Sequence, residues 1–310
     1  MLRSHVLAAS WAVLYSVLAP FLGRPWFAVI GLAAALVTLL RWVPAMWAAA
    51  AAGAAGSFGL VIDLVATAGA GRVEDWPRLL NGLGCAVGAV LLAVAATATR
   101  RRRRGRCVRC GDAHPPERTR KAAPEPSDPP RWVRVAAWLG AASFLPYAAI
   151  KTLWALGVPI GGFAGPDLHG DGAMGALGAG GIDLTAVLGV LAGVLNLALV
   201  ARWGQRFPRW TLVLAGRPVP RWIPLVPAWL GAVTLGPYGL GMAAILPFWG
   251  GLGYEAPWWI VGAAALGFGG FGVTAGIAAW WYQRRTRPVC LTPNVRSTGA
   301  GVWARSRSGR

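Results

Sequence analysis

The chain has 310 residues, of which 56% are hydrophobic and only 13% are charged. A soluble globular domain carries about 25% charged residues, so this composition excludes an ordinary soluble protein. Apolar runs of about 18 residues or more recur along the chain, and each can cross a hydrocarbon layer about 30 Å thick. The sequence therefore predicts an all-α integral membrane protein.

The net charge of +19 is explained by membrane topology rather than by nucleic-acid binding. Basic residues gather on the cytoplasmic side of membrane proteins. We therefore expect both termini in the cytoplasm, anionic lipid headgroups as partners and no nucleic-acid partner. Of the 30 Lys and Arg residues, 26 lie in alternate segments between the apolar runs, namely Arg3, Arg41, residues 100–134, residues 202–221 and residues 284–310.

Taken in chain order, the apolar runs predict eight membrane helices. The second is the shortest, because only fifteen residues separate Trp26 from Arg41, and it spans only if its flanking arginines extend toward the headgroups. Without it, seven crossings would place the N-terminus outside, against the distribution of basic residues. The first run has no A-x-A cleavage site and is expected to remain as a helix. The eight helices are expected at about residues 5–23, 26–41, 43–69, 79–99, 133–155, 182–202, 223–247 and 257–281.

Similar phrases recur at the starts of these segments and predict four helical hairpins built as parallel two-helix repeats. Arg41, Arg131 and Arg221 are ninety residues apart, and the last two begin RWVRVAAWLGAASFLPYAA and RWIPLVPAWLGAVTLGPYG. The return helices carry small residues that let helix backbones approach closely. These faces are expected to pack either within one chain or between chains of a homo-oligomer. The small-residue motifs are GLAAA at 31–35, GCAVG at 84–88, GVLAG at 189–193 and GVTAG at 272–276.

Composition divides the chain into four parts. Residues 1–99 and 132–283 form two membrane halves of four helices each. Residues 100–131 are basic and proline-rich and have no apolar periodicity, so they predict a cytoplasmic linker. Residues 284–310 predict a disordered basic tail in the cytoplasm.

The linker contains the motif CVRCGDAH, which is typical of a zinc knuckle. Cys107 and Cys110 have the C-x2-C spacing, and His114 follows as a third candidate ligand. Structural zinc takes four tetrahedral ligands, so the site would need a further donor from Cys290 or from a second subunit. The alternative is a pair of reduced thiols without a metal, which the cytoplasm would maintain.

Three ionisable residues lie near the predicted outer ends of the spans. A charge at the bilayer centre costs roughly 2.5–3.5 kcal/mol on insertion scales, and Asp63, Lys151 and Asp183 all avoid that depth. One interpretation is interfacial placement, with a salt bridge between Lys151 and Asp183. The other is an outward-facing polar pocket lined by all three, with Asn81 and Glu255 nearby.

The function predicted from these features is not catalytic. The sequence contains no G-x-S-x-G, H-E-x-x-H or P-loop motif and no pair of acids within a span. One candidate is a permease or transport-accessory protein that binds an unknown small molecule in the outer pocket. The other is a membrane scaffold or regulatory protein whose basic C-x2-C linker binds anionic lipid, a partner or zinc.

The phrases PRW, RWIPLVPAWLGA, LPYAAIKTLWALG and RRRRGRCVRCG resemble those of a group of multi-pass membrane proteins from high-GC actinobacteria. The resemblance covers most of the membrane portion and implies a location in the bacterial plasma membrane. No activity is known for that group, so the resemblance transfers no functional residue.

Overall fold

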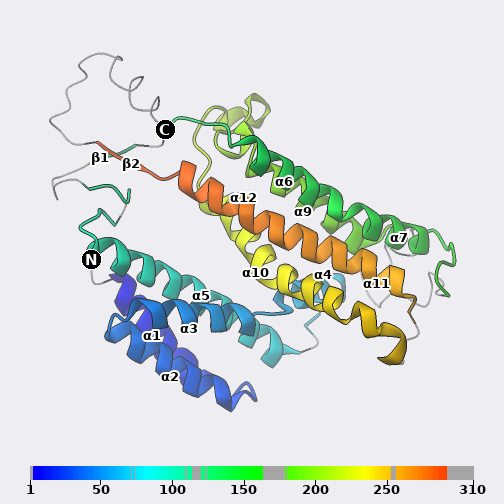
Figure 1. Ribbon diagram of the computed structural model, residues 1–310, viewed down its shortest axis with the longest axis horizontal. Helices are drawn as coiled ribbons and strands as arrows, with labels where there is room; N and C mark the ends of the chain where they lie inside the picture. The colour runs from blue at the N-terminus through cyan, green and yellow to red at the C-terminus, as the bar shows by residue number, and fades with distance from the viewer. Residues whose placement is uncertain are drawn as a thin grey trace.

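The computed structural model describes residues 3–291 except residues 71, 74, 109, 114–119, 123, 163–177, 179 and 253–255. The described chain is a bundle of long helices with two short strands at one end (Figure 1). This confirms the predicted helical class.

The N-terminal half packs consecutive helices against each other, α1 against α2 and α3 against α5, while α5 also crosses α1. The predicted third span is interrupted between α3 and α4, where Gly59 has a φ of +84° that favours glycine. Helix α5 runs on through the first four arginines, past the boundary predicted at residue 99. The helices are α1 Arg3–Leu18, α2 Pro25–Leu39, α3 Val43–Gly56, α4 Leu60–Ala70 and α5 Trp76–Arg103.

In the C-terminal half, α6 and α7 pack against α9, and α10 packs against α11 and α12. Pro146 opens α7 directly after α6, whereas α10 continues through Pro227 and Pro237. The elements are α6 Arg131–Ser143, α7 Leu145–Ala155, α9 Leu184–Ala198, the 3-10 turns η2 Arg202–Gly204 and η3 Arg209–Leu214, α10 Trp222–Ile245, η4 Leu246–Leu252, α11 Trp258–Ala265, the π turn η5 Leu266–Gly270 and α12 Phe271–Arg285.

Five helical segments are long and apolar enough to cross a membrane. They are Val43–Ala68, Trp76–Arg103, Arg131–Ala155, Trp222–Gly251 and Trp258–Arg285. Helices also occupy the other three predicted segments, but Ser4–Leu18, Pro25–Leu39 and Leu184–Ala198 are shorter. At 1.5 Å per residue these three extend only about 22 Å, so the helix lengths do not by themselves give eight crossings.

The outer surface of the bundle is apolar, as expected for helices that face lipid. Leu32, Val90, Leu139 and Val190 are each more than half exposed along their helices. A soluble monomer rarely exposes so much contiguous apolar surface.

The predicted small-residue faces pack within the chain. A Cβ atom at Gly272 would lie 2.3 Å from the backbone nitrogen of Gly236, so α12 and α10 can approach this closely only with glycine. In the same way, a Cβ at Gly193 would lie 3.2 Å from the carbonyl oxygen of Ala141 on α6. Of the two uses predicted for these motifs, the structure therefore favours packing within one chain over packing between chains.

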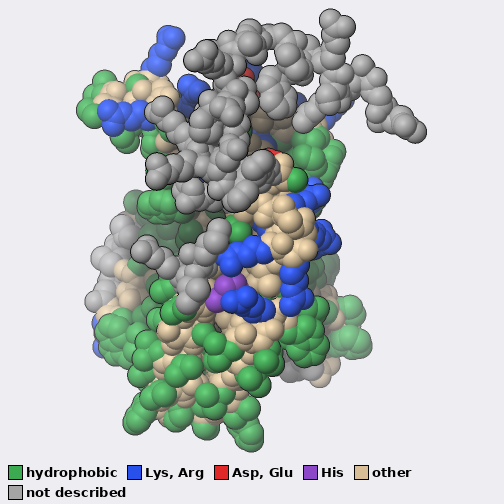
Figure 2. All heavy atoms as spheres, turned by 90° about the vertical axis from the view of Figure 1, so that its left-hand side faces the viewer, with side chains coloured by type: hydrophobic (Ala, Val, Ile, Leu, Met, Phe, Trp, Pro, Cys, Tyr) green, Lys and Arg blue, Asp and Glu red, His purple; other side chains and the backbone are tan. Residues whose placement is uncertain are grey.

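One end of the molecule, called the basic end below, collects the starts of α1, α3, α6 and α10 and the ends of α2, α5, α9 and α12 (Figure 1). These are the segments predicted to be cytoplasmic. Figure 2 looks onto this end and shows its Lys and Arg side chains between apolar flanks. Arg103 Nη2 donates to the carbonyl oxygen of Arg41 at 2.8 Å, which ties α5 to the α2–α3 connection.

Candidate metal centre

Three cysteines that are far apart in sequence meet at the basic end. The sulfur atoms of Cys107, Cys110 and Cys290 all lie within 4.8 Å of one another. The Cys107 and Cys290 sulfurs are 4.0 Å apart, and Cys110 is buried while the other two are half-buried. Three thiols at this separation can hold one metal ion.

Two short strands bring the third cysteine to the linker. Strand β1, Arg120–Ala122, pairs antiparallel with β2, Val289–Leu291, and places Lys121 opposite Cys290. Strand β2 follows α12 after only a short connection. Of the tail predicted to be disordered, residues 284 and 285 belong to the end of α12 and residues 289–291 form β2.

The C-x2-C segment forms a tight turn in which a backbone N–H points at the sulfur of one of its own cysteines. The backbone N–H of Gly111 donates to the carbonyl oxygen of Cys107 at 2.9 Å, and the φ of +89° at Gly111 suits glycine. The next N–H, that of Asp112, points at the sulfur of Cys110 at 3.4 Å. An N–H directed at sulfur stabilises the thiolate, which is the form that binds metal.

The surroundings of Cys110 favour its protonated thiol. Burial, together with hydrogen bonds to Cys290 and Cys107, raises the pKa of Cys110 to about 11, although the N–H of Asp112 opposes this. A divalent cation would shift the equilibrium from thiol to thiolate, because its charge stabilises the thiolates that bind it.

Arginines surround the turn and would complement a metal–thiolate cluster. A side chain at Gly111 would meet atoms of Arg101 and Arg287 at 3.6 and 3.7 Å. Burial, followed by the charges of Arg101 and Arg284, lowers the pKa of Arg287. A divalent ion with three thiolates carries one net negative charge, which this positive surrounding would stabilise.

The cluster supplies three of the four donors that zinc prefers. The remaining predicted ligand, His114, lies outside the described residues. Cys85, the fourth cysteine, is buried in α5 and lies 3.1 Å from the Tyr15 hydroxyl, so it belongs to the helix bundle.

Of the outer ionisable residues, Lys151 and Asp183 lie together. The Lys151 ammonium is 3.8 Å from the Asp183 carboxylate, and the two side chains are 19% and 15% exposed. Lys151 also faces the rings of Trp154 and Tyr147, at 5.4 and 6.0 Å from their centroids. Asp183 in addition accepts a hydrogen bond from the Ala186 N–H at the start of α9.

The third predicted pocket residue, Asp63, has a different partner. Its carboxylate lies 3.0 Å from the Arg78 guanidinium, so the ion pair joins α4 to α5. Asn81, predicted to lie near the pocket, accepts a hydrogen bond from the Tyr15 hydroxyl at 2.6 Å. Glu255 lies outside the described residues. Asp63 therefore forms an ion pair with Arg78, and Lys151 forms a separate one with Asp183.

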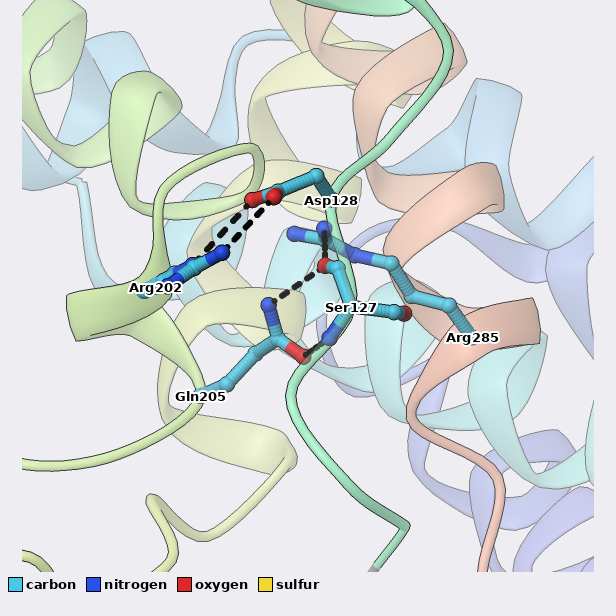
Figure 3. A network of polar contacts seen from close by, with 5 residues as sticks. All are labelled: Ser127, Asp128, Arg202, Gln205 and Arg285. Atoms are coloured by element: carbon cyan, nitrogen blue, oxygen red, sulfur yellow. Dashed lines mark hydrogen bonds and ion pairs between the residues drawn. The ribbon is translucent and has the colours of Figure 1, made fainter.

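Sequence reasoning missed a polar network that fastens the end of the linker to the C-terminal half (Figure 3). Gln205, which is buried, accepts from the Ser127 N–H at 3.1 Å and donates to the Ser127 carbonyl oxygen at 3.0 Å. Arg285 of α12 donates to the same carbonyl oxygen. A hydrogen bond from Arg202 lowers the pKa of Asp128 beside it. The feature of the sequence that could have indicated this network is Gln205, an uncharged polar residue in a basic loop.

Comparison of the chain with protein-family models, with curated proteins and with solved structures finds no match. The function must therefore be inferred from the chemistry of the site itself.

Proposed function

We propose that this chain is a membrane-embedded scaffold or regulatory protein, without enzymatic activity, in which zinc bound at the basic end joins the linker to the tail. The observation that carries this proposal is the convergence of the Cys107, Cys110 and Cys290 sulfurs within 4.8 Å. Thiolates select zinc, copper(I) or iron–sulfur clusters, and a C-x2-C turn with a distant third cysteine is typical of structural zinc.

Zinc at this position would make the tail respond to metal supply. The linker leaves the N-terminal half at α5, and the tail leaves the C-terminal half at α12, so one ion would connect the two halves at the basic end. Binding energy at such a site goes into ordering the protein around it. A partner at the basic end would then bind an ordered surface when zinc is present, and a less ordered surface when zinc is absent.

Zinc per chain, measured by elemental analysis of the purified protein, tests the proposal. We expect about one zinc per chain, and much less than one in Cys107→Ser and in Cys290→Ser, since each variant removes one of the ligands. Cys85→Ser is the matched control, because it replaces a cysteine outside the cluster and should retain the metal. A native protein without metal, or a Cys290→Ser variant with full zinc, would contradict the proposal.

The proposed topology has eight crossings in four hairpins, with the basic end in the cytoplasm. It is supported by the helices in all eight predicted segments and by the grouping of the predicted cytoplasmic segments at one end. The three short helices would cross with help from flanking residues or local thinning of the bilayer. Single cysteines placed at Gly23 and Gly105 should react with an impermeant maleimide from opposite sides. Equal reactivity from one side would exclude this topology.

A transport function is the second candidate, and the Lys151–Asp183 pair favours it. Both groups are mostly buried and lie beside aromatic rings, in a setting that can bind a charged small molecule. Replacement Lys151→Met would abolish substrate flux in a transporter while leaving the protein folded. In a scaffold it would only weaken the contact between α7 and α9.

A further inference from the structure

The loop between α9 and α10 forms a defined projection, called the finger below and comprising residues 205–219. Its two strands are held together by their own backbone. The N–H of Phe207 donates to the Arg217 carbonyl oxygen at 3.0 Å, and the Gly216 N–H donates back to Phe207 at 2.9 Å. A third bond, from Val219 N–H to the Gln205 carbonyl oxygen at 2.9 Å, closes the base. The finger therefore has a fixed shape.

The tip of the finger exposes large apolar side chains. Trp210, Leu212 and Val213 are 79%, 83% and 80% exposed within the turn η3. Leu212 has a φ of +47° and a ψ of −95°, a positive-φ backbone conformation that a leucine rarely adopts. A strained backbone that holds an apolar side chain away from the protein indicates a function for that side chain outside the folded core.

The finger also carries three arginines. Arg206, Arg209 and Arg217 belong to the finger, and the structure records no carboxylate of a described residue within ion-pair distance of them. An open cavity of about 510 Å³ lies beside the base of the finger and is lined by Pro126, Arg202, Trp203, Arg206 and Pro208. Guanidinium groups beside a tryptophan suit a phosphate at the edge of a bilayer.

The position of the finger brings these features to the membrane surface. It connects the ends of two helices at the basic end, and in Figure 1 the yellow-green segment after α9 stands out beside the start of α6. Figure 2 shows apolar and basic side chains on a lobe at the side of the bundle. A projection to the side of a membrane bundle lies over the surrounding lipid headgroups.

We infer that the finger is an interfacial anchor that binds anionic phospholipid in the leaflet at the basic end. Trp210, Leu212 and Val213 enter the boundary between headgroups and acyl chains, as the apolar face of an interfacial helix does. The three arginines of the finger and the cavity at its base take the lipid phosphates. This inference goes beyond the proposed zinc function, because none of its residues is a ligand of the metal centre.

A spin label at Val213→Cys measures the depth of the tip directly. The four native cysteines are replaced by serine so that only one thiol is labelled, and the chain is reconstituted in nanodiscs with or without phosphatidylglycerol. Collisions with oxygen report contact with lipid, and collisions with a water-soluble nickel complex report contact with water. Labels at Val190→Cys, exposed on α9, and at Glu125→Cys, exposed on the linker, calibrate the two extremes.

The inference predicts that the label at residue 213 collides with nickel less often than the label at residue 125. Its rate of collision with oxygen should lie between the rates at residues 125 and 190. Replacing Arg206, Arg209 and Arg217 by Gln should shift the label toward water in nanodiscs that contain phosphatidylglycerol. The inference would be overturned if the label at residue 213 collided with nickel as often as the label at residue 125. It would also be overturned if the depth of the label at 213 changed neither with phosphatidylglycerol content nor with replacement of the arginines. Shielding from both reagents would also overturn it, since it would indicate a contact with another protein chain. Because this chain lacks the metal ligands, the outcome is independent of the zinc proposal.

Discussion

Cys110 and Cys85 show that residue type alone does not determine the chemistry of a side chain. Both are buried, yet Cys110 faces two other thiols and a backbone N–H, while Cys85 faces the hydroxyl of a tyrosine. The C-x2-C spacing identified Cys110 as a candidate ligand, and the predicted cytoplasmic side singled out Cys290. The partner of Asp63 could not be found in this way, because Arg78 and Lys151 are equally suitable cations in the sequence.

The metal-free form of Cys110 should react only at high pH. Its pKa rises from 9.0 to about 11, and the thiolate is the nucleophile, so alkylation at neutral pH should be slow. Because the folded pKa is raised, this thiol stabilises the metal-free turn below pH 9, and that stabilisation is lost as pH rises toward 11. Mass spectrometry of iodoacetamide-treated protein, stripped of metal, gives the rate at each pH. Rapid alkylation at pH 7 would show that the thiol is already ionised.

At the scale of elements, helix contacts follow from glycine positions more than from proline positions. Pro146 coincides with a helix boundary, but Pro237 leaves α10 continuous, and the break before α4 has no proline. A proline ring removes one hydrogen bond, and neighbouring helices decide whether a kink results. The small-residue spacing therefore predicts helix contacts, whereas the position of a proline does not by itself locate a break in a helix.

The two glycines of the motif GVTAG should respond differently to alanine. At Gly272 a Cβ would lie 2.3 Å from the Gly236 nitrogen, whereas at Gly276 it would lie 3.4 Å from the Ala232 Cβ, an ordinary contact. Gly272→Ala should force α10 and α12 apart and destabilise the protein by about 1–3 kcal/mol, as overpacking generally does.

Gly276→Ala is the matched control and should be close to neutral. Unfolding of each variant in mixed detergent micelles measures the difference. Equal stabilities for the two variants would show that the α10–α12 contact is not as close as described.

At the scale of the whole molecule, the two membrane halves have largely separate cores. One buried cluster of the N-terminal half contains Ala12, Ala34, Ala35, Ala50 and Leu92, and one of the C-terminal half contains Val133, Ala137, Leu199, Ala278 and Tyr282. The halves touch where α10 packs against α4 and α3, and the ring of Phe58, just before α4, lies 5.6 Å from that of Tyr238. The strands β1 and β2 make a second connection at the basic end, directly beside the cysteine cluster.

Composition predicted the membrane class because apolar run length is a local property of the chain. The strand pairing between linker and tail could not be predicted, since Lys121 and Cys290 are far apart in sequence and three-residue strands carry no periodicity. The finger was also missed, because its basic residues were explained by topology alone.

The pairing of β1 with β2 makes the linker a reporter of metal binding. Lys121 and Lys151 are the only lysines of the chain, and Lys151 lies in α7 in an ion pair with Asp183. Endoproteinase Lys-C should therefore cut only after Lys121, and only when β1 separates from β2. We expect the metal-loaded protein to resist cleavage and a zinc chelator to accelerate it, since removing the ion frees Cys290 from the linker.

Two variants separate this effect from general unfolding. Cys290→Ser should be cut rapidly with or without the chelator, while Cys85→Ser should behave as the native chain does. After cleavage the fragments should remain together during purification, because the contact of α4 with α10 does not involve the linker. Cleavage that is equally fast in all three proteins and insensitive to chelator would show that metal does not hold the strands. Fragments that separate would instead show that the linker is the principal connection between the two membrane halves.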